Sequence, residues 1–263
     1  MNRSLPTPPT ILTFGGHDPS GGAGIQADIE TISALGGHAA TIITALTTQD
    51  SGKVYNFYPV DSAILTEQAQ LIFNDFNVSA VKIGMVGSIE ICHAIHTIML
   101  EYPEIPIVLD PVLSGGGGGT LSETELAHAI AEKLAPLATL ITPNRKELLK
   151  LGTTKELITA GTKNILVTGT DHPQPDEDSS LVHHLLTERN GATSSFTDQR
   201  LPYTYHGSGC TLAAATACGL AFDKDIGEAI RDGLEYSWRS LKNGFKPGAG
   251  QHFPRRIQHK HLK

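Results

Sequence analysis

Cysteine, aromatic residues and positive charge are all scarce in this sequence. Its three cysteines, Cys92, Cys210 and Cys218, are too few and too scattered for a disulfide framework or a zinc site. Aromatic residues make up only 6% of the chain, so its core must be built mainly from Ala, Val, Ile and Leu. The net charge of -7, from 20 Lys and Arg against 27 Asp and Glu, gives no overall electrostatic reason to bind nucleic acid.

Long hydrophobic runs are also absent. No stretch approaches the ~18 apolar residues expected of a membrane span, and the opening MNRSLPTPPT has no long apolar segment after its Arg. We therefore expect a cytoplasmic protein with neither a membrane nor a nucleic acid as partner. Any anionic ligand must then be held by local geometry rather than by overall charge.

The apolar residues that are present fall into short runs that alternate with helical patterns. The predicted strands are Thr10–Phe14, Ala40–Leu46, Val78–Ile83, Ile105–Leu109, Leu137–Ile141, Ile165–Val167, Leu181–Thr187 and Thr193–Asp198. The predicted helices are Ile25–Leu35, Ala63–Phe76, Ile89–Leu100, Ser122–Leu134, Thr211–Phe222 and Ile226–Phe245. The alternation predicts an α/β fold with a mainly parallel sheet. The turn at Asn190-Gly191 predicts an antiparallel hairpin near the C-terminal third.

One domain is expected, because α/β proteins of 263 residues routinely form a single domain around one sheet. Residues 1–9 are Pro-rich and predict a flexible N-terminal arm, and residues 10–250 form the predicted domain. Residues 251–263 are expected to be a polar tail, of which the closing RRIQHKHLK is solvated.

A glycine-rich turn, His206–Thr211, leads directly into an Ala-rich helix. The backbone N–H groups at such a helix start can hold a phosphoryl group, and glycine lets that group approach closely. Cys210 lies in the first turn, where the helix dipole could lower its pKa and a bound phosphate could raise it. The alternative is a Gly-containing N-cap before a core helix, with Cys210 as a small buried hydrophobe.

The first loop, Gly15–Asp28, is equally rich in glycine and implies close backbone approach to a ligand. It lacks the Lys of a P-loop. Gly22–Ala27 fits the spacing G-x-G-x-x-A, but several residues separate it from the preceding strand, which disfavours a dinucleotide-binding dehydrogenase. Asp28 could cap the following helix or face a ligand.

Carboxylates follow two other predicted strands. Asp110 ends the run IPIVL, where it can anchor hydrated Mg²⁺. Asn144 and Glu147 have the spacing of a capping box, which is the better interpretation of this pair in isolation. Together with Asp110, they could instead hold a metal ion beside the phosphates of ATP.

Several motifs occur in order along the chain. They are GHDPSGGAGIQAD at residues 16–28, ITAL at 43–46, KIGM at 82–85, LDPV at 109–112, TPN with Glu147 at 142–147, and HGSGCT at 206–211. On these motifs, the chain resembles the hydroxymethylpyrimidine/phosphomethylpyrimidine kinases of thiamine biosynthesis, members of the ribokinase-like superfamily, over roughly residues 11–222. The resemblance implies a three-layer α/β/α fold. It also implies ATP-dependent phosphorylation of the pyrimidine hydroxymethyl group and then of its monophosphate.

The resemblance further implies a role for individual residues. The pyrimidine pocket would be formed by Gly16, Asp28, Gln49, Met85 and Val112. Magnesium would be organised by Asp110, Asn144 and Glu147, and the nucleotide would contact Asn144 and Thr168. Cys210 would take the hydroxyl proton, with Gly207, Ser208, Gly209 and Cys210 supplying the anion hole. A homodimer is expected, and a requirement for a monovalent cation is left open.

The sequence departs from the family pattern in two loops. Thr168-Gly169-Thr170 stands where family members usually carry Lys-Gly-Gly, and Ser114 with five glycines replaces a Lys-Ser-Gly. Such a glycine run can close as a lid over a substrate. Two other functions are retained as alternatives: a pyridoxal or pyridoxine kinase, and a non-catalytic pyrimidine-binding regulatory protein.

Overall fold

One twisted sheet organises the chain. The computed structural model describes residues 7–113, 123–169 and 178–257, so the predicted glycine lid at 115–119 lies outside the described residues. The strands in sheet order are β3 (Val54–Pro59), β2 (His38–Gln49), β1 (Thr10–His17), β4 (Val78–Ile83), β5 (Ile107–Leu109), β6 (Leu140–Ile141), β7 (Asn164–Val167), β8 (Leu181–Glu188) and β9 (Thr193–Gln199).

The middle of the sheet is parallel and its margins are antiparallel. The strands from β2 to β7 run parallel, whereas β3 pairs antiparallel with β2 and the hairpin β8–β9 continues antiparallel from β7. The predicted α/β fold and hairpin are therefore confirmed. The strand β3 was not predicted, because it is a half-exposed edge strand without a run of buried apolar residues.

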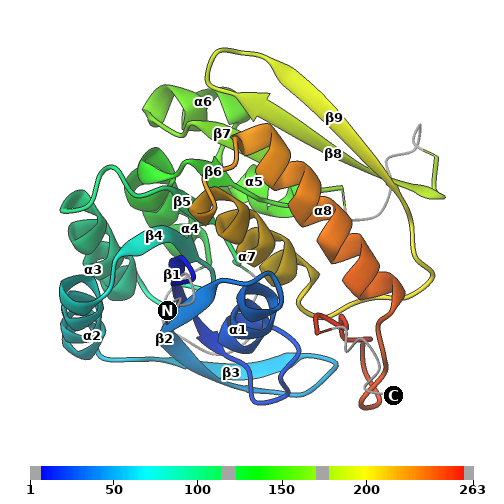
Figure 1. Cartoon of the computed structure of the whole chain (residues 1–263), viewed down its shortest axis with the longest axis horizontal. Coiled ribbons are helices and arrows are strands. Elements are labelled where there is room, and N and C mark those ends of the chain that lie inside the picture. The colour runs from blue at the N-terminus through cyan, green and yellow to red at the C-terminus, as the bar shows by residue number, and fades with distance from the viewer. Residues whose placement is uncertain (1–6, 114–122, 170–177, 258–263) are drawn as a thin grey trace, which may run out of the picture.

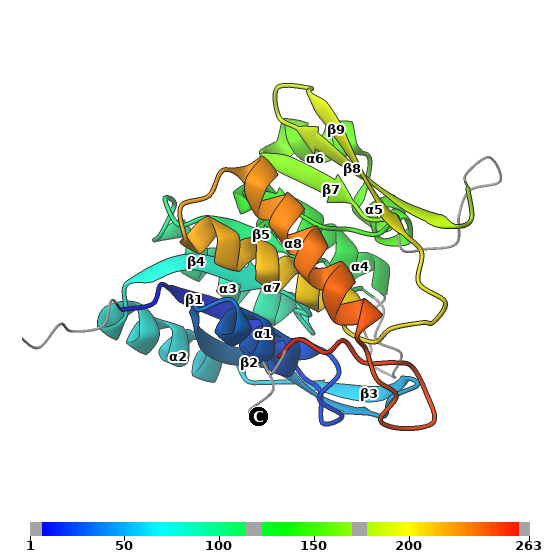
Figure 2. The same cartoon turned by 45° about the vertical axis from the view of Figure 1, so that its right-hand side comes forward.

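Helices cover both faces of the sheet. On one face lie α1 (Gly24–Ala34), α7 (Ser208–Ala221) and α8 (Ile226–Lys242). On the other lie α2 (Ser62–Asp75), α3 (Ile89–Leu100), α4 (Glu123–Ala129), α5 (Arg145–Leu151) and α6 (Thr154–Ala160). Figures 1 and 2 show α1, α7 and α8 together in front of the strands, which gives three layers.

Alternation along the strands divides the core in two. Leu12 and Phe14 of β1 pack with α2 and α3, whereas Ile11 packs with α1 and α7. Successive side chains of a strand point to opposite faces, so the buried strands carry apolar residues at almost every position. The Ala-rich sequence of α7 suits its place, because small side chains let the helix lie close to the sheet beneath α8.

Two predicted segments differ in the structure. The helix expected at residues 122–134 is α4 followed by one π-helical turn, Ile130–Leu134. The prediction of a solvated tail is wrong for Arg256, which is only 2% exposed. Its guanidinium is paired with Glu30 of α1 and hydrogen-bonded to Thr211 of α7. Within the described ranges, no helix is long and apolar enough to cross a bilayer.

Candidate active site

The loops that follow the parallel strands surround a cavity of about 280 Å³. Parallel sheets gather the carboxyl ends of their strands along one edge, where ligands usually bind. All but one of the predicted site residues line this cavity, namely Gly16, Gln49, Met85, Asp110, Val112, Asn144, Glu147, Thr168, Gly207, Ser208, Gly209 and Cys210. Residues as far apart in the sequence as Gly16 and Cys210 are thus brought together.

The start of α7 forms one wall of the cavity. Gly207 precedes the helix with φ of 80°, and no side chain caps the first turn. A Cβ at Gly207 would lie 2.0 Å from the carbonyl oxygen of Gly22, so the two glycine-rich loops touch only because both residues lack a side chain. The amide groups of this turn and the helix dipole favour an anion at this wall.

A lysine that the sequence argument had not assigned a role also lines the cavity. Lys82 is fully buried in β4, and its Nζ lies 2.9 Å from Oδ1 and 3.1 Å from Oδ2 of Asp28. Burial alone would lower the pKa of Lys82, but the charge of Asp28, aided by that of Asp110, raises it instead. Asp28 itself is fully buried and does not line the cavity, so it acts there through the ammonium group.

The thiol of Cys210 is the resting form. Burial raises the pKa of Cys210 to about 12, although the charge of Lys82 opposes the rise. The sequence left open whether this pKa is lowered or raised, and burial raises it. Burial likewise raises the pKa of Asp110 to about 6, so this carboxyl group is ionised at neutral pH.

The donor set fits a hydrated magnesium ion. Oδ2 of Asp110 is buried and has no hydrogen-bond partner within the described residues, and it faces Gly209. Among the described residues no cluster of three His, Cys, Asp or Glu side chains could enclose a metal ion. Mg²⁺ often keeps several waters and takes one or two carboxylates plus substrate phosphates, which agrees with Asp110 as a direct ligand.

Asn144 and Glu147 form the predicted capping box of α5. The Asn144 side chain accepts from the amide of Glu147 at 2.9 Å, and the Glu147 carboxylate accepts from the amide of Asn144 at 2.9 Å. Both residues also line the cavity. The capping interpretation is thus confirmed, and a role near the metal ion must be indirect or must share these oxygen atoms.

A contact between Asp18 and His206, which the sequence argument did not predict, joins the first loop to the start of α7. Oδ2 of Asp18 accepts from the amide of Ala23 at 2.8 Å and lies 2.9 Å from Nε2 of His206. Burial would raise the pKa of Asp18, but hydrogen bonds from His206, Ser20 and Ala23 lower it to about 2. An Asp followed by a Ser two residues later, within a glycine-rich loop, is a turn signal that could have pointed to this carboxylate.

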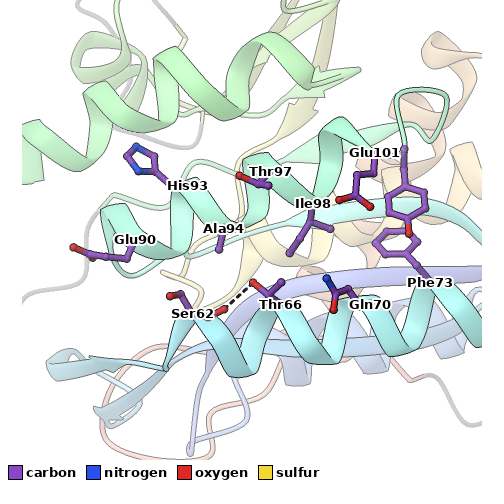
Figure 3. Close-up of a pocket in the computed structure, with 11 residues that line it drawn as sticks. Ser62, Thr66, Gln70, Phe73, Glu90, His93, Ala94, Thr97, Ile98 and Glu101 are labelled. Atoms are coloured by element: carbon purple, nitrogen blue, oxygen red, sulfur yellow. Dashed lines mark hydrogen bonds between the residues drawn. The ribbon is translucent and has the colours of Figure 1, made fainter.

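A larger cavity, of about 340 Å³, lies between α2 and α3 and holds none of the predicted site residues. Figure 3 shows polar side chains of the two helices around it, including Ser62, Thr66 and Gln70. The stacked rings of Phe73 and Tyr102 lie at one end, with centroids 3.8 Å apart. The smaller cavity, which the predicted site residues line, is therefore the candidate active site.

Comparisons with known proteins show the family to which this chain belongs. The model of the phosphomethylpyrimidine kinase family matches residues 18–255. A hydroxymethylpyrimidine/phosphomethylpyrimidine kinase of Streptomyces coelicolor is 33% identical over 93% of this chain and 93% of its own length.

Two solved structures share the fold. A Bacillus subtilis pyridoxal kinase, in an ADP complex, superposes with a TM-score of 0.83 at 27% identity, over 95% of this chain and 98% of its own. A Clostridium difficile phosphomethylpyrimidine kinase superposes with a TM-score of 0.71 at 31% identity, over 88% of this chain and 98% of its own. The chain is a kinase that belongs to the phosphomethylpyrimidine kinase family.

Proposed function

We propose that this kinase uses ATP to phosphorylate 4-amino-5-hydroxymethyl-2-methylpyrimidine and then its monophosphate, giving the diphosphate used in thiamine diphosphate biosynthesis. The observation that carries the proposal is the single cavity in which the first loop, Asp110 and the open start of α7 meet. The family match supplies the substrate class.

Gln49 gives the cavity an acceptor suited to an aminopyrimidine. The hydroxyl of Thr47 donates its one proton to the carbonyl of His17 at 2.8 Å, so it must accept from Nε2 of Gln49 at 2.6 Å. This fixes the orientation of the amide. Oε1 of Gln49 is left buried without a partner in the described part of the chain. The exocyclic amino group of the substrate would satisfy it, with Gly16, Met85 and Val112 against the ring.

The phosphates would lie between α7 and Asp110. The amides of Gly207–Cys210 would hold the transferred phosphoryl group, and Asp110 would bind Mg²⁺, supported by Asn144 and Glu147. Thr168 would offer a hydroxyl to the nucleotide. Magnesium would neutralise charge on the phosphates. Phosphoryl transfer is largely dissociative, so position and charge contribute more than early proton removal.

Cys210 is the proposed acceptor of the hydroxyl proton. Only its thiolate can accept a proton, and burial keeps the thiol in its neutral form at rest, so the thiol must first release its own proton to solvent. The ammonium of Lys82 favours the thiolate, so we place this lysine beside the proton transfer rather than beside the ring. Because the proton leaves late in a dissociative reaction, loss of Cys210 should reduce turnover without abolishing it.

The test is direct. The purified protein is incubated with Mg-ATP and, separately, with hydroxymethylpyrimidine, its monophosphate or pyridoxal, and the products are resolved by mass. Formation of the pyrimidine diphosphate supports the proposal. Pyrimidine binding without any product would contradict it and favour the regulatory alternative.

A second candidate is pyridoxal kinase activity. The observation in its favour is that the Bacillus subtilis pyridoxal kinase superposes with the higher TM-score, 0.83 against 0.71 for the Clostridium difficile enzyme. Phosphorylation of pyridoxal alone in the same assay would assign the chain to vitamin B6 salvage.

The remaining expectations come from the family resemblance. We propose a cytoplasmic homodimer, which sedimentation at assay concentration would test. Turnover measured with Mg²⁺ removed by a chelator, and with K⁺ replaced by Na⁺ or by an organic cation, would test the two ion requirements separately.

A further inference from the structure

The C-terminal segment His252–Arg256 packs against both glycine-rich loops of the candidate site. The amide of His206 donates to the carbonyl of His252 at 2.9 Å, and the ring of Phe253 lies 5.6 Å from that of His206 between centroids. A Cβ at Gly22 would approach the Phe253 ring to 2.7 Å. Figure 2 shows this end of the chain, in red, running beside the blue first loop and α1.

The guanidinium of Arg256 joins three separate elements. Nε donates to the hydroxyl of Thr211 at 2.9 Å, Nη1 lies 3.1 Å from Oε2 of Glu30, and Nη2 donates to the carbonyl of Gly22. Its backbone carbonyl is fixed by the hydroxyl of Tyr236 at 2.8 Å. The planar fork of Arg can serve three acceptors in fixed directions, which the single ammonium of Lys cannot do.

The contact with Thr211 is transmitted to the start of α7. The hydroxyl of Thr211 donates to the carbonyl of Gly207 at 2.8 Å, and the amide of Thr211 donates to the same carbonyl at 3.0 Å. Gly207 is the residue that touches the carbonyl oxygen of Gly22, and Arg256 donates to that same oxygen. The first loop and the proposed anion hole are therefore both fastened to one buried side chain.

We propose that Arg256 is a positioning residue for phosphoryl transfer, which holds the first loop and the start of α7 at a fixed separation. The proposal rests on the proposed role of Gly207–Cys210 as the anion hole. Arg256 lies one position beyond the segment that the family model matches, so the match itself assigns it nothing. Misplacement of reacting groups by about 1 Å can lower turnover by about 100-fold.

The test compares Arg256→Ala with Arg255→Ala. Arg255 is the adjacent arginine. It is exposed, and its side chain donates to the carbonyl of Asn243 and lies over the ring of Phe245. With Mg-ATP and hydroxymethylpyrimidine we expect kcat of Arg256→Ala to fall about 100-fold with little change in KM for the pyrimidine. Arg255→Ala should stay within about 2-fold of the wild type. Guanidinium ion at millimolar concentration should restore part of the kcat of Arg256→Ala and none in the control.

A merely structural role predicts a different set of results. Leu157→Ala empties a buried position on α6, away from the cavity, and supplies a variant of lowered melting temperature. If it lowers kcat as much as Arg256→Ala, or if guanidinium restores nothing, the proposal is overturned.

A second measurement does not depend on the substrate. Hydrogen exchange followed by mass spectrometry should become faster in Arg256→Ala in peptides covering Gly21–Gly24 and Gly207–Ala215, and not in β8 and β9. Unchanged exchange in both loops overturns the positioning role whatever the enzyme phosphorylates. If the wild-type enzyme does not phosphorylate the pyrimidine, that result contradicts only the proposed function.

Discussion

Two of the helices that begin at the cavity, α5 and α7, begin differently. The start of α5 is closed, because Asn144 and Glu147 satisfy each other's amides in a capping box. The start of α7 is open, since Gly207 brings no side chain and none caps the turn. A capped helix start has used its donors internally, whereas an uncapped one keeps them for a ligand. The first of these helix starts therefore serves stability, and we propose that the second binds an anion.

The largest expected effect comes from adding a methyl group to the open start. Gly207→Ala places a Cβ 2.0 Å from the Gly22 carbonyl oxygen, so the turn must shift and the anion hole with it. We expect steady-state kcat to fall by about 100- to 1,000-fold. The matched control is Gly191→Ala, which has a similar φ of 86° but open space around the new atom. Equal losses of activity in the two variants would show that the open start has no special role.

The second effect concerns the thiol in the first turn of α7. Cys210→Ala should lower kcat about 100-fold for both phosphorylation steps, because a general base typically contributes that much. Cys218 lies further along the same helix, where it is buried and does not line the cavity, and Cys218→Ala should leave kcat unchanged. Rates near wild type in Cys210→Ala, measured by rapid-quench kinetics, would remove Cys210 as proton acceptor.

The contact of Asp18 with His206, which joins the first loop to α7, should make stability depend on pH in the acid range. The folded pKa of Asp18 is about 2, below its ordinary 3.8, so its ionisation stabilises the folded state above pH 4 and this stabilisation is lost as pH falls toward 2. Urea denaturation should find Asp18→Asn less stable than wild type by about 2 kcal/mol at pH 6, with the difference shrinking below pH 4. A difference that does not depend on pH would exclude the carboxylate as its cause.

The smallest effect tests the closed start. Asn144→Ala should lower stability by about 1 kcal/mol through loss of the cap. The matched control is Thr153→Ala, which removes the N-cap of the capping box of α6, away from the cavity. If Asn144 also supports the metal and nucleotide, KM for Mg-ATP should rise about 10-fold in Asn144→Ala alone. If KM for Mg-ATP is the same in the two variants, Asn144 acts only as a helix cap.

The sequence predicted elements whose signal is local. Val78–Ile83 is a strand with the predicted bounds, and the glycine-rich loops lie at the cavity as expected. The strand β3 was missed, because a half-exposed edge strand has no run of buried apolar residues by which to recognise it. Sequence periodicity reports burial against the sheet, and it says little where one face of a strand is in solvent.

The pairings of buried charges could not be predicted, because the partners are distant in the sequence. A lysine within the buried strand Val78–Ile83 signals that a partner must exist, yet nothing in the sequence selects Asp28. The burial of Arg256 was harder to predict, because a polar C-terminal stretch gives no sign that one of its arginines enters the core. The family resemblance assigned no role to Arg256, nor to Lys82, although Lys82 lies in one of the motifs.

The bond between Gly22 and Arg256 spans 234 positions, almost the whole chain. Contacts of such long range form late in folding, since a large loop must close before they can form. During synthesis the sheet and most of its helices can assemble before residues 252–256 have been added. The contacts that Arg256 makes with the first loop and with α7 therefore form only after that segment has been made.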